Sequence, residues 1–318
     1  KNIPTYSPPG NPITFNFVGK PNTGTITIPA ARVNVYGDTQ IDKLLASGNT
    51  VLLANPYPSA ISATALVTHP TNVARKMGTL YFWTSVAGYN NSTGQYTQND
   101  YASWNISGSA LPPGTDPNNT SLIPSGNIAS GQGFFAQVFV DGEVVFNNSM
   151  RINNNNAQFF RMAEGATEEP ETATELERHR IWVNLSNGTD AYRQMMMGYI
   201  EGATNALDTQ YDGSSFTQNE IDIYTILGKE QLAIQGRALP FNPQDIIPLG
   251  FKVTNEGKYT LALGHSDGLF SDYKTMVLKD KLTNNYHNLN EGSYTFDTKA
   301  GTFNNRFELY FTEQNSTE

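Results

Sequence analysis

The chain has 318 residues, with 20 basic and 29 acidic side chains, so its formal net charge is −9. It contains no cysteine, which excludes disulfides, thiolate metal sites and cysteine nucleophiles. The acidic balance argues against a nucleic-acid partner. No apolar run approaches the roughly 20 residues of a transmembrane helix, which argues against membrane insertion.

The N-terminal half predicts short strands separated by polar loops. A strand at residues 50–54 should end at Asn55-Pro56-Tyr57-Pro58, because proline lacks an N–H and restricts the residue before it. Ser59 is expected to cap a helix over residues 60–66. Further strands are predicted at residues 13–18, 24–28, 79–85, 101–106, 132–140 and 143–146. The last two should form a hairpin across Asp141-Gly142.

An acidic segment separates the two halves of the chain. Residues 164–177 are rich in glutamate, include Pro170 and have few large apolar side chains. A run of like charge repels itself and cannot nucleate a core. We therefore expect an N-terminal domain at residues 1–163, an exposed linker at 164–177 and a C-terminal domain at 178–318.

The C-terminal half is more regular. Strands are predicted at residues 180–185, 192–201, 221–225, 231–235, 246–254, 259–263, 275–279, 293–296 and 306–312. Short strands about ten residues apart, with turn residues between them, are typical of a sandwich. The predicted fold is therefore all-β, with two antiparallel β-sandwich domains of jelly-roll or immunoglobulin-like type, long polar loops and few short helices.

Several segments carry ordered motifs of one kind of protein. Residues 48–60 (GNTVLLANPYPSA) resemble the segment G-W-N-L-I-G-N-P-Y-P-S-A of large secreted surface proteins of the Bacteroidetes, especially flavobacteria. The resemblance continues at residues 128–135 (IASGQGFF), 180–185 (RIWVNL), 198–205 (GYIEGATN), 234–241 (IQGRALPF) and 301–307 (GTFNNRF). It covers most of residues 45–312.

This resemblance implies a cellular location and a broad role. Such proteins look like cargo of the type IX secretion system, adhesin-like or gliding-associated, and the matching region usually precedes a C-terminal sorting domain. No sorting domain is expected before Glu318, and residues 1–10 have no signal-peptide core, so anchoring and export stay open. The expected function is that of a secreted, non-catalytic structural or adhesion module at the outer cell surface that mediates protein or glycan contacts. The alternatives are a secreted carbohydrate-active enzyme, its accessory carbohydrate-binding domain, or a subunit of a surface layer or filament.

Aromatic side chains around residues 88–100 are the candidate binding residues. They are Tyr89, Tyr96, Tyr101 and Trp104, set in and beside a loop of Asn, Ser, Thr and Gln. Tyrosine supplies contact area at a modest entropic cost. We expect neutral glycans or other surface proteins, including copies of this chain, as partners, because a net charge of −9 repels anionic polymers.

Asn205, Asp208 and Asp212 form the candidate cation site. Hard oxygen ligands on a glycine-containing loop suit Ca²⁺, although the same side chains also cap turns. The histidines show none of the pairing of a zinc motif, and no catalytic residue is singled out. Tyr57 should pack inward at a stiff corner, and Gly131–Phe135 should begin a strand rather than cradle a phosphate.

Overall fold

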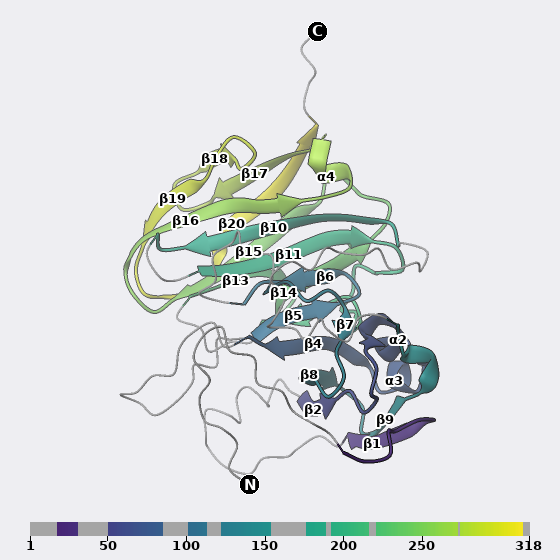
Figure 1. Cartoon of the computed structure of the whole chain (residues 1–318). Helices are drawn as coiled ribbons and strands as arrows, with labels where there is room; N and C mark the ends of the chain where they lie inside the picture. The colour runs from purple at the N-terminus through teal and green to yellow at the C-terminus, as the bar shows by residue number, and fades with distance from the viewer. Residues whose placement is uncertain are drawn as a thin grey trace, which may run out of the picture.

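The computed structural model describes residues 18–30, 50–84, 101–112, 122–153, 176–188, 192–215, 221–272 and 274–313. The protein is all-β, with a few short helices, as predicted (Figure 1). We call residues 18–153 the N-terminal lobe and residues 176–313 the C-terminal lobe. None of the helices among the described residues is long and apolar enough to cross a membrane.

The N-terminal lobe is built on a five-stranded antiparallel sheet in the order β2-β8-β4-β5-β6. Its strands are β1 (Ile26–Ala30), β2 (Thr50–Ala54), β3 (Ile61–Ser62), β4 (Met77–Trp83), β5 (Tyr101–Asn105), β6 (Gly108–Ala110), β7 (Asn127–Ile128), β8 (Gly133–Val138) and β9 (Gly142–Phe146). Its helices are α2 (Ala63–Val67), α3 (Pro70–Ala74) and the 3₁₀ helix η2 (Asn148–Met150).

The hairpin predicted across Asp141-Gly142 is wrong. Strand β9 pairs with β1, whereas β8 pairs with β2 on one side and β4 on the other. Because both edges of β8 are already occupied, β9 has no free edge of β8 to join. The chain turns at Gly142, but the two strands enter different sheets.

The predicted helix is also displaced. Residues 61 and 62 pair with β7 as strand β3, so α2 begins only at Ala63. The hydroxyl of Ser62 accepts the backbone N–H of Ala65 at 3.2 Å and is the cap. Ser59 is not the cap, because its hydroxyl accepts from Arg151 Nε at 2.7 Å.

The corner predicted after β2 is confirmed. Tyr57 is buried and its hydroxyl donates to the carbonyl of Gly24 at 2.6 Å. Asn55 is buried beside it and donates to the carbonyls of Ser59, Ile128 and Ala129 at 2.8–3.1 Å. Its side-chain oxygen accepts the N–H of Tyr57. The Asn-Pro-Tyr-Pro motif therefore has a structural role, because its hydrogen bonds fix the corner after β2.

The C-terminal lobe is one 11-stranded sheet in the order β18-β17-β20-β15-β13-β14-β11-β10-β16-β19, with β12 added beside β14. Its elements are β10 (Arg178–Ser186), β11 (Tyr192–Ile200), β12 (Gly213–Ser214), β13 (Ile221–Leu227), β14 (Glu230–Ala238), β15 (Ile246–Val253), β16 (Gly257–Ser266), α4 (Leu269–Asp272), β17 (Lys274–Asp280), β18 (Asn285–Asn288), β19 (Tyr294–Thr298) and β20 (Gly301–Glu313). All pairs are antiparallel except β11 with β14, which the sequence did not predict.

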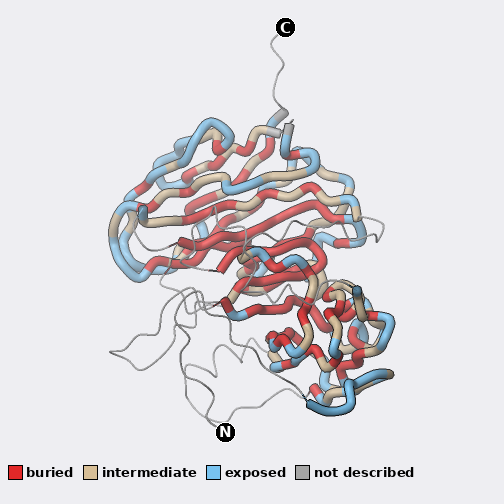
Figure 2. Tube along the Cα trace, in the orientation of Figure 1, coloured by how far each residue is buried: buried red, intermediate tan, exposed pale blue. Residues whose placement is uncertain are grey.

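This sheet bends over a single aromatic core. The ring of Phe251 on β15 lies 5.4 Å from that of Phe296 on β19, although six places separate these strands in the sheet order. Tyr199 on β11 likewise meets Phe311 on β20 at 6.3 Å. Strands that are distant in the sheet order therefore face each other across the core, and buried residues follow the central strands (Figure 2).

The two lobes pack closely against each other. Trp182 on β10 donates its indole N–H to the carbonyl of Ser109 at 2.7 Å, and the N–H of Leu111 donates to Gln194 at 3.1 Å. Between these bonds lies a small apolar cluster of Ala110, Met196 and Ile234. The division near residue 165 stays a prediction, since residues 164–175 lie outside the described residues. The packing itself was not predicted.

A buried ion pair lies in the C-terminal lobe close to this contact. Arg193 Nε on β11 donates to Asp222 Oδ1 on β13 at 3.0 Å, and both side chains are only 2% exposed. The hydroxyl of Ser215 accepts from Arg193 at 3.2 Å and donates to the other oxygen of Asp222. Burial raises the pKa of Asp222, while Arg193 opposes that rise.

Candidate functional site

The structure describes two of the four predicted aromatic binding residues, Tyr101 and Trp104. Tyr89 and Tyr96 lie outside the described residues, so their role stays a prediction. Tyr101 is half-buried, with its ring 5.7 Å from that of Phe135. Trp104 is buried in the core of the N-terminal lobe, and a side chain in that position cannot offer its ring to a glycan.

The predicted cation ligands are engaged in holding the backbone. Asp208 accepts the N–H of Thr204 at 2.6 Å, and Asn205 accepts the N–H of Ala238 at 3.2 Å. Asp212 accepts the N–H of Asp208 at 2.7 Å with one oxygen and that of Gly236 at 3.0 Å with the other. Among the described residues, no group of three or more His, Asp or Glu could hold a metal ion. A Ca²⁺ ion at these residues stays a prediction.

Asp212 is electrostatically unusual. It is buried beside the contact between the lobes, where its carbonyl oxygen accepts from the hydroxyl of Thr79 at 3.1 Å. Burial raises the pKa of the Asp212 carboxyl to about 7, even though its two backbone hydrogen bonds act in the opposite direction. This carboxyl therefore changes charge near neutral pH inside the folded protein.

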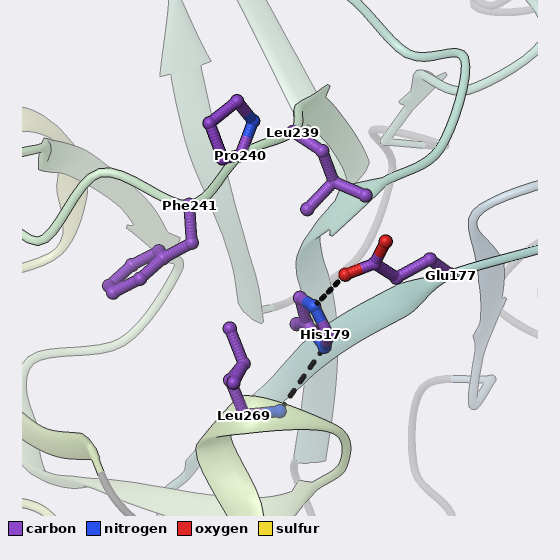
Figure 3. Close-up of a pocket in the computed structure, with 6 residues that line it drawn as sticks. All are labelled: Glu177, His179, Leu239, Pro240, Phe241 and Leu269. Atoms are coloured by element: carbon purple, nitrogen blue, oxygen red, sulfur yellow. Dashed lines mark hydrogen bonds and ion pairs between the residues drawn. The ribbon is translucent and has the colours of Figure 1, made fainter.

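A pocket of about 430 Å³ lies where β10 begins, between the loop after β14 and helix α4 (Figure 3). Ligand pockets commonly enclose roughly 300–1,000 Å³. Leu239, Pro240, Phe241 and Leu269 form its apolar wall, and Glu177 and His179 form its polar wall. The peptide bond between Leu239 and Pro240 is cis.

Both ring nitrogens of His179 are occupied. Nδ1 accepts the backbone N–H of Leu269 at 3.2 Å, so the proton of the neutral ring lies on Nε2. Nε2 lies 2.9 Å from Glu177 Oε1 and donates to it. No hydroxyl or thiol occurs among the six described residues that line the pocket. The histidine therefore orients Glu177 and has neither a free lone pair nor a nucleophile to activate.

Aromatic side chains of the C-terminal lobe pack against the apolar wall of the pocket and hold it in place. The ring of Phe241 meets the rings of Tyr199, Phe270 and Phe311 edge-on, at centroid distances of 4.9–5.2 Å. The hydroxyl of Tyr199 in turn donates to Asp245 at 2.7 Å, which ties the loop after β14 to β11. Contacts within the protein thus fix the apolar wall of the pocket.

The sequence contained a sign of this pocket that the prediction missed. Glu177 and His179 are two residues apart at the start of a strand, and alternation places such side chains on one face. Glu177 was expected to belong to an exposed linker. Glu177 is exposed, its N–H donates to Glu201 at 3.2 Å and its carboxylate accepts from His179.

An exposed ring, that of Tyr286, and a half-buried one, that of Tyr310, lie on the outer face of the other end of the C-terminal sheet. Strand register aligns Tyr286, Lys279, Glu308 and Pro248 in one row across β18, β17, β20 and β15, and Tyr310 and Ile246 in the next row. We call these six residues the tyrosine face. Figure 1 shows β18 and β17 at the end of this lobe remote from the N-terminal lobe.

The tyrosine face is ordered by its own contacts. Tyr286 is 59% exposed, its ring lies 6.3 Å from that of Tyr310, and Lys279 Nζ lies 4.9 Å from its centroid. Tyr310 donates to Glu308 at 2.7 Å, a hydrogen bond that, with burial, raises the pKa of its hydroxyl to about 12. The face therefore presents rings in a fixed arrangement on a rigid sheet.

The comparisons with known proteins give a family and no activity. A family described as "Domain of unknown function (DUF8693)" matches residues 3–311, which include both lobes, the pocket and the tyrosine face. No curated protein and no solved structure matches the chain.

Proposed function

We propose that this chain, which belongs to the DUF8693 family of domains of unknown function, is a non-catalytic adhesion module at the outer surface of a bacterial cell. The resemblance of its motifs to secreted surface proteins supports the location. The tyrosine face is the observation that carries the binding role. It meets neutral glycans or the surfaces of other proteins.

The chemistry of the face supports this proposal. Tyr286 and Ile246 expose 59% and 49% of their surfaces, and exposed apolar groups gathered on one face are typical of interaction sites. Lys281 Nζ lies 2.7 Å from Glu308, so the carboxylate beside the rings is neutralised. Ordered rings beside a neutralised carboxylate suit an uncharged partner such as a neutral polysaccharide.

Substitution of Tyr286 by alanine tests the proposal. Tyr286→Ala should lower retention on insoluble neutral polysaccharides or on immobilised surface proteins at least about tenfold, since an aromatic anchor contributes about 2 kcal/mol or more. Leu282→Ala is the matched control, because Leu282 is also exposed and lies in the turn between β17 and β18. Equal retention of both variants and of the unaltered chain would remove the tyrosine face from the binding surface.

A further inference from the structure

We propose that the pocket beside His179 binds a primary ammonium group on an apolar stem, presented as the lysine side chain of a partner protein. This inference concerns a different surface from the tyrosine face and does not depend on the adhesion proposal.

The polar wall of the pocket offers an acceptor and no free donor. Glu177 is 62% exposed on its side chain, and only one of its oxygens is engaged, by His179. No described residue hydrogen-bonds the second oxygen, which points away from His179 in Figure 3. Because both nitrogens of His179 are occupied, a ligand must bring donors of its own. An ammonium group has three donors and no acceptor.

The charges around the pocket favour a cation. Glu201 Oε2 accepts the backbone N–H of Glu177 at 3.2 Å, so a second carboxylate lies beside the backbone of Glu177. Arg178 and Arg180 occupy the alternate positions of β10 and project from its opposite face. Arg237 is paired with Asp245 at 2.9 Å. The positive side chains nearest in the chain are thus directed elsewhere or already neutralised.

The remaining walls suit the stem of a lysine side chain. Leu239, Pro240 and Leu269 can cover methylene groups, which lysine commonly buries while its charged end stays near water. The ring of Phe241 adds an aromatic surface that attracts a nearby cation. A net charge of −9 increases the rate at which a basic partner arrives.

A pair of probes with the same four-carbon stem tests the charge requirement. Nα-acetyl-lysine-N-methylamide should bind, with shifts of the Leu269 amide and the His179 ring resonances in NMR titrations of the full chain. Nα-acetyl-norleucine-N-methylamide has the same stem without the ammonium group and should bind up to about fivefold more weakly. Hexanoate, with a similar stem and the opposite charge, should not shift these resonances.

The Glu177→Gln variant tests whether the preference for lysine over norleucine depends on the Glu177 carboxylate. The amide oxygen can still accept from His179 and the side chain is exposed, so we expect the variant to fold. It should lose the preference for lysine over norleucine, whereas Glu256→Gln, at an exposed turn away from the pocket, should keep it. The proposal is overturned if norleucine equals lysine in the unaltered chain, if neither probe shifts Leu269, or if Glu177→Gln keeps the preference. Tyr286→Ala should leave this titration unchanged, which separates the two proposals.

Discussion

Replacement of Arg193 by methionine should destabilise the protein strongly. The guanidinium and the Asp222 carboxylate are each 2% exposed, and their atoms lie 3.0 Å apart. Removing one partner leaves a buried charge without compensation, which costs about 3–5 kcal/mol. Methionine fills much of the volume of arginine, so the loss should come mainly from Asp222 rather than from a cavity.

Equilibrium unfolding in urea measures this cost. Arg193→Met should lower the midpoint with an unchanged slope, since the surface exposed on unfolding stays the same. Lys281→Met is the control, because Lys281 is 41% exposed and its pair with Glu308 should contribute at most about 1 kcal/mol. Equal losses in the two variants would refute the reasoning from burial.

A double variant isolates the unpaired charge. Asp222→Asn combined with Arg193→Met removes the charge, while the amide can still bond Ser215 and the N–H of Ile223. It should recover a large part of the stability lost in Arg193→Met. If the double variant is as unstable as the single one, the loss arises from packing.

Two further predictions concern buried polar groups. Asn55→Ala should cost about 3 kcal/mol, because three carbonyls lose their donor and two of these hydrogen bonds are buried. Asn22→Ala, whose single bond to Pro56 is exposed, should cost far less in the same urea unfolding assay. For Asp212, the folded pKa of about 7 exceeds the unfolded value of about 3.9, so the folded state holds the extra proton between these pH values. The contribution of Asp212 to the free energy of unfolding should therefore fall by roughly 4 kcal/mol as pH rises from about 4 to 7. Asp212→Asn should flatten this part of the pH profile, and an unchanged profile would contradict the assignment.

Local patterns predicted the strands well and their partners poorly. The strand at residues 50–54 and the corner at Tyr57 were correctly predicted, because alternation and proline act within a few residues. The Asp141-Gly142 hairpin failed because β8 had already been paired on both sides by strands distant in sequence. The packing of the lobes depends on contacts such as Trp182 with Ser109, for which the chain has no local pattern.

The candidate site was harder to predict for the same reason. Trp104 was grouped with a polar loop by its neighbours in sequence, yet its strand places it in the core. The pocket joins the start of β10, the loop after β14 and helix α4, which are far apart along the chain. Tyr286 and Tyr310 come together only through the pairing of β17 with β18 and β20.

The most direct test of the adhesion proposal is to locate the contact surface on the bound protein. Hydroxyl-radical footprinting, read by mass spectrometry, compares the free chain with the chain held on an insoluble neutral polysaccharide or an immobilised surface protein. We expect Tyr286 and Tyr310 to be protected on binding while the exposed Leu207 reacts as before. Protection confined to Tyr89 and Tyr96, with Tyr286 fully reactive, would contradict it.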